Sequence, residues 1–281
     1  MNEVISRRQL NDTVIKMEIA APLIAKKASA GQFVILRIDE RGERIPLTIA
    51  DFDREEGTIS IIFQIAGGTT RLLAELKEGD SVLDLTGPLG MPTEFGDAKK
   101  ACVIGGGVGC AIAYPAAKAL FNMGAEVDVI AGFRNREIVI LEEEFKKVSN
   151  NLFITTDDGS YGEKGFVTEK LKSLVEAGNN YDLVIAIGPV IMMKFVCKTT
   201  EPYSIKTIVS LNPIMIDGTG MCGGCRVTVG GKIKFACVDG PDFDGHKVDF
   251  DELINRNSTY NEKEKHSREK CRLFGGVENN A

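Results

Sequence analysis

Three cysteines fall within 16 residues in the C-terminal part of the chain, inside a segment rich in glycine: Cys222, Cys225 and Cys237. A plant-type [2Fe–2S] site uses the spacing C-x4-C-x2-C and a distant fourth cysteine. This segment reads D-x4-C-x2-C-x11-C, with Asp217 in the first position. Glycine lets a loop wrap closely around a cluster, with backbone N–H groups aimed at its sulfurs. Such a segment has little apolar material of its own, so it predicts a metal-binding loop carried by a larger fold.

Asp217 is the unusual member of this set. A carboxylate can bind iron, but it is a harder ligand than a thiolate. Asp217 could instead cap the loop or lie outside the ligand set, with a different fourth ligand. A structural zinc ion held by three cysteines and one aspartate is the alternative to a [2Fe–2S] cluster, and unligated core cysteines are a third interpretation.

Composition narrows the class of protein. The chain has 281 residues, enough for about two domains of roughly 150 residues each. Its net charge is −6 with no basic block, which argues against a nucleic-acid partner. The N-terminus lacks the apolar run of a signal peptide, and no apolar stretch reaches the roughly 18 residues that span a membrane. We therefore expect a cytoplasmic protein without a membrane partner, whose seven cysteines are thiols or metal ligands rather than disulfides.

The pattern of apolar residues changes twice along the chain. Residues 1–97 contain short β-branched runs at 14–19, 32–38, 58–65 and 81–85, punctuated by glycine and aspartate, which predict an antiparallel β-barrel. Residues 98–210 alternate short apolar strands with helical runs, which predicts an α/β parallel-sheet domain. Residues 211–250 form the expected [2Fe–2S] region. The polar residues 251–281 are expected to be a tail that could dock a partner.

Three short segments of the barrel point to a flavin. An Arg and a Thr four residues apart on one strand face can both reach a pyrophosphate and ribityl chain. A Gly-Gly-Thr-Thr run that opens a short helix offers backbone N–H groups to phosphate. A Gly-Pro-Leu-Gly turn ends the barrel. The candidate flavin-binding residues are Arg44, Pro46, Leu47, Thr48, Gly67, Gly68, Thr69, Thr70 and Gly87.

The α/β segment carries a candidate nucleotide site. A glycine-rich loop follows its first strand and opens a helix, which is the context of a pyrophosphate loop, although the G-x-G-x-x-G spacing is absent. Ligands of such sheets bind at the carboxyl ends of the strands. The candidate residues are Gly105, Gly106, Gly107, Val108, Gly109, Arg134, Asp157, Asp158, Gly188 and Pro189. Cys110 is a small residue of the same loop that could also lie near the nicotinamide, and no other catalytic residue is expected.

The order of barrel, nucleotide sheet and [2Fe–2S] loop resembles the ferredoxin–NADP reductase superfamily over nearly the whole chain, to about residue 250. Residues 44–48, 67–70, 105–109 and 156–165 resemble the electron-transfer subunit of bacterial dihydroorotate dehydrogenase. That subunit has four cysteine ligands, and this sequence departs from it at Asp217. The run from Asp217 to Cys225 is similar instead to the small (alpha) subunit of NADH-dependent reduced ferredoxin:NADP+ oxidoreductase, also described as the small subunit of sulfide dehydrogenase.

This second resemblance implies that Asp217, Cys222, Cys225 and Cys237 ligate the cluster, with FAD in the barrel and NAD(H), or NADP(H), on the sheet. It implies a large glutamate-synthase-like flavoprotein partner with FAD and [4Fe–4S] clusters, an indirect link to ferredoxin, and flavin-based electron bifurcation. The expected reaction is hydride exchange between NAD(H) and FAD, followed by single-electron transfer through the cluster. Alternatives are an electron-transfer subunit of dihydroorotate dehydrogenase or sulfide dehydrogenase, and a non-enzymatic zinc-bearing scaffold.

Overall fold

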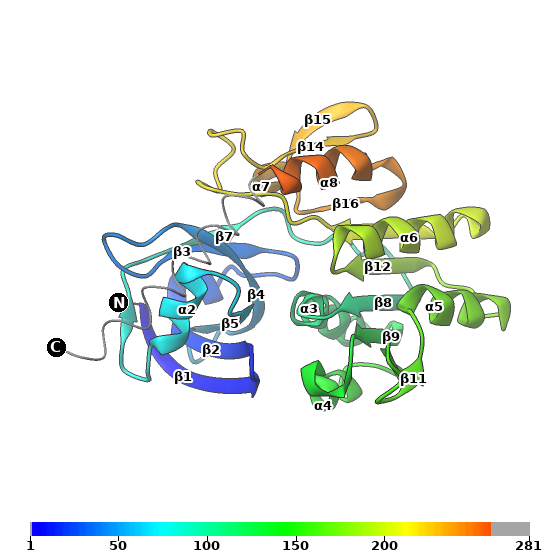
Figure 1. Cartoon of the computed structure of the whole chain (residues 1–281), viewed down its shortest axis with the longest axis horizontal. Coiled ribbons are helices and arrows are strands. Elements are labelled where there is room, and N and C mark those ends of the chain that lie inside the picture. The colour runs from blue at the N-terminus through cyan, green and yellow to red at the C-terminus, as the bar shows by residue number, and fades with distance from the viewer. Residues whose placement is uncertain (1, 260–281) are drawn as a thin grey trace.

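The first part of the chain is a barrel. The computed structural model describes residues 2–259, and its first seven strands form one antiparallel sheet that curls on itself (Figure 1) in the order β6-β1-β2-β5-β4-β3-β7. The strands are β1 (Asn2–Asn11), β2 (Val14–Ala20), β3 (Phe33–Arg37), β4 (Ile45–Asp53), β5 (Thr58–Gln64), β6 (Ser81–Val82) and β7 (Asp84–Leu89). Two short helices accompany them, α1 (Pro22–Ala25) and α2 (Gly68–Glu75).

Alternation along these strands fills the barrel. Ile15, Met17 and Ile19 of β2 are fully buried, and they pack with Ile59 and Ile61 of β5. This is the period-2 pattern of strands with one face in the core. The run expected as a single strand at 81–85 is instead divided between β6 and β7, because β6 pairs with β1 and β7 pairs with β3.

The second part is a seven-stranded sheet in the order β11-β10-β9-β8-β12-β13-β16, parallel except for β16. Its strands are β8 (Lys100–Gly106), β9 (Glu126–Phe133), β10 (Asn151–Thr156), β11 (Glu163–Lys164), β12 (Leu183–Ile187), β13 (Lys206–Ser210) and β16 (Asp242–Asp244). The helices and 3-10 turns are α3 (Gly109–Asn122), η1 (Arg136–Ile138), α4 (Glu142–Lys146), α5 (Val167–Glu176), α6 (Val190–Thr200) and η2 (Glu201–Tyr203). The antiparallel barrel and the parallel α/β sheet expected from the sequence are both confirmed.

The third part covers the top of the other two in Figure 1. It contains a loop at 211–225, a hairpin of β14 (Arg226–Val229) and β15 (Lys232–Phe235), and then α7 (Ala236–Asp239), η3 (Gly245–Lys247) and α8 (Phe250–Ser258). The expected tail therefore begins too early, because Phe250 and Leu253 bury one face of α8 in the core. Residues 260–281 lie outside the described residues.

The parts share packing surfaces. Helix α3 lies between the barrel and the sheet (Figure 1), and the barrel residues Val14, Ala50 and Ile62 belong to the same apolar core as α3 and β8. Lys118 of α3 also forms an ion pair with Asp51 of β4, with Nζ 2.7 Å from Oδ1. Within residues 2–259, no helix has the length and apolar character to cross a membrane.

Candidate functional site

The predicted nucleotide residues gather at one edge of the parallel sheet. The loops after β8, β9, β10 and β12 all leave from the carboxyl ends of parallel strands, where ligands of such sheets bind. The Asp158 N–H lies 3.3 Å from the Arg134 carbonyl oxygen. A Cβ added to Gly188 would lie 3.1 Å from Gly106 Cα, so the first and fourth loops touch. The structure thus brings the four predicted segments together.

Glycine in the 105–109 loop serves close packing and one turn. A Cβ at Gly109 would lie 2.5 Å from the Ile187 carbonyl oxygen, and one at Gly106 would lie 2.5 Å from Met192 Sδ. The first contact seats the start of α3 directly against the end of β12, and the second packs the loop on α6. Gly107 instead has φ +57° and nothing within 4 Å of an added Cβ, so the turn faces open space. A half-buried turn with open space beside Gly107, at the start of a 14-residue helix, fits a pyrophosphate.

Cys110 lies beneath this loop rather than on its surface. Its side chain is fully buried in the core, and burial raises the pKa of its thiol. A Cβ added to Gly105 would lie 2.7 Å from Cys110 Sγ. The structure therefore supports the packing role of Cys110 and gives no support to a surface role beside the nicotinamide.

The segments that follow β9 and β10 bring together a pair of side chains that the sequence did not single out. Arg136 lies over the Tyr161 ring, with Cζ 5.3 Å from its centroid, and the Arg136 N–H donates to Ser160 Oγ at 2.9 Å. The exposed Arg134 and Asp158 flank this pair. Asp158 is held ionised, because hydrogen bonds from Ser160 lower the pKa of its carboxyl. The only sequence signal for the pair was a second arginine two residues after Arg134.

The candidate flavin residues of β4 divide between its two faces. Ile49 is fully buried in the barrel core, and Leu47 packs against the same core. Pro46 and Thr48 therefore face the other way, because side chains alternate along a strand. Arg44 lies just before β4 and is exposed. Arg44, Pro46 and Thr48 are therefore placed where they could contact a ligand outside the barrel. The Leu47 side chain belongs to the core.

The start of α2 presents open space and an ordered turn. A Cβ added to Gly67 or Gly68 would meet nothing within 4 Å. Thr70 Oγ1 accepts the N–H groups of Ala66 and Gly67 at 2.9 and 3.0 Å, so it holds the turn. Thr69 Oγ1 donates to Glu43 Oε2 at 2.9 Å. An open glycine turn before a helix fits a flavin phosphate.

Gly87 has a different environment from the α2 turn. A Cβ there would lie 2.8 Å from Val34 Cγ1 and 3.2 Å from the Phe33 carbonyl oxygen. The glycine thus allows β7 to pack closely on β3. Close packing of β7 on β3 is therefore enough to explain why a glycine stands at position 87, and no ligand contact is needed.

The glycine-rich loop places the predicted iron ligands in one region but does not close them around one point. Asp217 accepts the N–H groups of Thr219 and Cys222 at 2.9 and 3.0 Å, and the first of these bonds lowers the pKa of the carboxyl. The structure therefore shows the capping role for Asp217. Among residues 2–259, no group of three or more His, Cys, Asp or Glu side chains is close enough to hold one metal ion. The ligand set stays a prediction.

The thiols nevertheless fit a cluster. Cys225 Sγ and Cys237 Sγ are 3.2 Å apart, close to the spacing of about 3.8 Å for two thiolates about 2.3 Å from one tetrahedral metal ion. Backbone N–H groups of Gly224 and Cys237 lie 3.5 Å from the sulfurs of Cys222 and Cys225. Burial, with the hydrogen bond to Cys225, raises the pKa of Cys237 to about 12. Without a metal the Cys237 thiol would stay protonated at neutral pH, so a buried Cys237 thiolate requires a cation.

The cluster loop also touches the barrel. Gly218 has φ +77°, and a Cβ there would lie 2.8 Å from Ile35 Cγ1 and 2.9 Å from Leu89 Cδ1. Only a glycine lets the loop approach strands β3 and β7 this closely. The predicted iron site therefore lies against the barrel that holds the predicted flavin residues.

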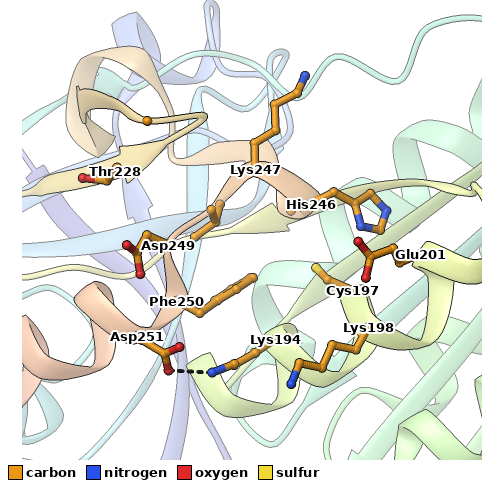
Figure 2. Close-up of a pocket in the computed structure, with 13 residues that line it drawn as sticks. Lys194, Cys197, Lys198, Glu201, Thr228, His246, Lys247, Asp249, Phe250 and Asp251 are labelled. Atoms are coloured by element: carbon orange, nitrogen blue, oxygen red, sulfur yellow. Dashed lines mark hydrogen bonds and ion pairs between the residues drawn. The ribbon is translucent and has the colours of Figure 1, made fainter.

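A separate cavity of about 470 Å³ opens beside α6, η3 and α8 (Figure 2). Positively charged lysines and negatively charged carboxylates both line it. Lys194 Nζ is paired with Asp251 Oδ1 at 2.5 Å. The Phe250 ring points into it (Figure 2). None of the residues predicted to hold a cofactor lines this cavity, so it is distinct from the site described above.

Two family models match the chain. Residues 212–249 match the iron-sulfur cluster binding domain of dihydroorotate dehydrogenase B. Residues 103–198 match the oxidoreductase NAD-binding domain. The first match contains all of the predicted cluster ligands, and the second contains the glycine-rich loop and the other predicted nucleotide residues.

Similar proteins cover nearly the whole chain. A Thermotoga maritima homolog of the dihydroorotate dehydrogenase B (NAD(+)) electron transfer subunit is 46% identical over 270 residues, which are 96% of this chain and 95% of that protein. The Streptococcus mutans electron transfer subunit is 33% identical over 88% of this chain and 97% of that protein. A chain of the NADH-dependent reduced ferredoxin-NADP oxidoreductase structure, described for flavin-based electron bifurcation, superimposes with a TM-score of 0.90, at 46% identity, over 96% of this chain and 97% of that one.

These matches confirm the expected cofactor classes, an iron–sulfur cluster, NAD(H) and FAD, and they confirm an oxidoreductase. The barrel followed by the NAD-binding sheet has the ferredoxin–NADP reductase architecture that binds flavin. The chain belongs to the family of electron-transfer subunits that includes those of dihydroorotate dehydrogenase B and the NADH-dependent reduced ferredoxin–NADP oxidoreductase type.

Proposed function

We propose that this chain is the electron-transfer subunit of a cytoplasmic, ferredoxin-linked NAD(P)H oxidoreductase that performs flavin-based electron bifurcation. When bound, the cofactors supply hydride exchange between nicotinamide and flavin and one-electron transfer at the cluster. The observation that carries the proposal is the contact of the Gly218 loop with Ile35 and Leu89, since it joins the predicted iron site to the barrel. The 46% identity to the bifurcating enzyme's chain supports this choice.

The side chains and backbone of this chain would hold and orient the cofactors. Gly107 and the start of α3 would bind the NAD(H) pyrophosphate, and Arg134 would contact its ribose or phosphate. Arg44, Thr48 and the turn at Gly67 and Gly68 would hold the flavin. The protein then contributes position and electrostatics rather than an acid–base group.

The proposed partner is a large glutamate-synthase-like flavoprotein with FAD and [4Fe–4S] clusters. Three apolar side chains are exposed around the cluster loop, Ile216 at 56%, Met221 at 88% and Val238 at 42%. An apolar group of this kind beside a redox site marks a protein contact. Copurification from the native host, with the partner identified by its mass, tests this part of the proposal.

A dihydroorotate dehydrogenase B subunit is the second candidate, because the family model of that enzyme matches residues 212–249. Asp217 favours the ferredoxin-linked oxidoreductase. The electron-transfer subunit of dihydroorotate dehydrogenase, which the sequence also resembles, has four cysteine ligands and no aspartate ligand. A purified complex that reduces NAD+ with dihydroorotate would favour the second candidate instead.

Asp217 provides the sharpest test of the site. We expect the purified protein to contain about two irons and one FAD per chain, because one [2Fe–2S] cluster has two irons and the chain has one flavin-type barrel. Asp217→Asn keeps an oxygen that can cap the loop but is a poor iron ligand, so iron content should fall or the electron paramagnetic resonance spectrum of the reduced protein should shift. Asp217→Cys should keep the iron and also change the spectrum.

The control is Asp251→Asn, which removes the ion pair between the exposed Asp251 of α8 and Lys194 of α6 and should leave the spectrum unchanged. An unchanged spectrum in Asp217→Asn would remove Asp217 from the ligand set. Stoichiometric zinc with less than about one iron per chain would instead support the zinc scaffold.

A further inference from the structure

A carboxyl group is enclosed where the three parts of the chain meet. Asp242 begins β16, five residues after Cys237, and its Oδ1 is the one buried side-chain oxygen or nitrogen without a hydrogen-bond partner among residues 2–259. Its Oδ2 accepts a hydrogen bond of 2.5 Å from Thr93 Oγ1. The residue as a whole is half-buried, but Oδ1 itself is shielded from water. An orphaned buried oxygen calls for a physical explanation.

The surroundings of this carboxyl group are polar but uncharged. Thr93 and Ser210 are buried, and the Thr93 hydroxyl is hydrogen-bonded to the Asp242 carboxyl, whereas Ser210 is the residue opposite Asp242 on the neighbouring strand β13. A Cβ added to Gly31 would lie 2.9 Å from Oδ2, so the barrel also closes over the group. Within residues 2–259, Asp242 forms no ion pair with a lysine, arginine or histidine side chain, and Lys206 of β13 is exposed.

Hydrogen bonds link this point to both neighbouring parts. The segment 90–93 connects the barrel to the sheet, and the Thr93 N–H donates to the Ala30 carbonyl oxygen at 2.9 Å. The Met91 N–H donates to the Gly240 carbonyl oxygen at 2.6 Å. Gln32 Nε2 donates to the Gly90 carbonyl oxygen at 2.9 Å. The connection between the barrel and the segment that follows Cys237 thus runs through residues 90–93 and 240–242.

The charge of the Asp242 carboxyl determines how it can interact with Thr93 where residues 90–93 meet residues 240–242. An ionised carboxylate here would have the Thr93 hydroxyl on Oδ2, no partner on Oδ1 and no ion pair, and burying an uncompensated charge is costly. In a neutral acid with the proton on Oδ2, the same hydrogen bond would be reversed, with Oδ2 donating to Thr93 Oγ1, and only the uncharged Oδ1 would stay unpaired. We propose that Asp242 keeps its proton in the folded protein at a pH where exposed aspartates are ionised, and acts through Thr93 as a positioning residue for the cluster-bearing segment.

Burial raises the pKa of Asp242, and the hydroxyls of Ser210 and Thr93 oppose the shift. The folded protein therefore binds the proton more tightly than the unfolded chain. This contribution to stability is fully present below the unfolded pKa of about 3.9 and is lost as the pH rises through the folded value. The Asp242→Asn variant should lack this dependence.

Infrared spectroscopy of the cofactor-loaded protein tests the proton directly. At pH 6, about two units above the usual aspartate pKa, the wild type should show a protonated-carboxyl carbonyl band that Asp242→Asn lacks. Asp244→Asn is the matched control, because Asp244 lies two residues further on and pairs with Lys247, and it should remove no band. If Asp242→Asn loses no protonated-carboxyl band relative to the wild type, the proposal is overturned.

A kinetic test addresses position and rests on the proposed function. After rapid mixing with NADH, Thr93→Val and Asp242→Ala should slow cluster reduction several-fold with flavin reduction unchanged, and Asp242→Asn should restore the wild-type rate. Wild-type rates of cluster reduction in Thr93→Val would overturn the positioning role even if Asp242→Ala fails to fold. A wild type whose cluster is never reduced would contradict the proposed function instead, and the infrared result would still decide the proton.

Discussion

Gly109 and Gly68 each open a helix, yet a methyl group would meet opposite surroundings at the two positions. An added Cβ at Gly109 would lie 2.5 Å from the Ile187 carbonyl oxygen, whereas nothing lies within 4 Å at Gly68. Gly109→Ala should force α3 away from β12 and lower the free energy of unfolding by about 1–3 kcal/mol in urea denaturation. Gly68→Ala should change stability by less than about 1 kcal/mol and weaken FAD binding in a titration, because the methyl would enter the open space. Equal losses of stability in the two variants would contradict this contrast.

Helix α8 shows how an element with a polar sequence belongs to the folded body. Its apolar side chains Phe250 and Leu253 are buried, and Arg256 Nη2 donates to the Gly224 carbonyl oxygen in the cluster loop at 3.3 Å. Leu253→Ala should therefore lower the free energy of unfolding by about 2–5 kcal/mol, measured by urea denaturation. The exposed Asn255→Ala on the same helix should stay within about 0.5 kcal/mol. If both variants were neutral, α8 would not be part of the cooperative core.

At the scale of the whole molecule, the barrel and the sheet share one apolar core. Ile62 of β5 belongs to the core built around α3, although it lies in the barrel sequence. We expect calorimetry to show the barrel and the sheet unfolding in a single transition. Ile62→Ala should lower the midpoint of that whole transition, since it removes about 2–5 kcal/mol of packing. The exposed Ile5→Ala is the control and should have a smaller effect. Two separate transitions, only one of them shifted, would argue against a shared core.

The sequence was sufficient for most strands and helices of the barrel and the sheet and for the class of cofactor expected of each segment, but not for the division of residues 81–85 between β6 and β7 or for α8. Short β-branched runs bounded by glycine and aspartate predicted β2 and β5, because such side chains pack well on a pleated sheet that is buried on at least one face. The glycine-rich loop after β8 was visible because close packing at Gly109 and the left-handed turn at Gly107 both demand glycine. Cysteine spacing predicted the iron–sulfur region, because the ligands of one cluster are close in the chain.

Contacts between residues far apart in the chain were decided only by the tertiary structure. The sequence grouped Leu47 with Pro46 and Thr48 as a candidate flavin-binding residue, but in the folded strand its side chain packs against the barrel core. The meeting of Thr93 with Asp242 joins positions 149 residues apart, and no local pattern marks it. Local periodicity reports which face of an element is buried, whereas the partner that buries it depends on how the whole chain packs. The sequence by itself therefore determined which cofactor chemistry each segment could support, and the packing of the three parts decided where those segments meet.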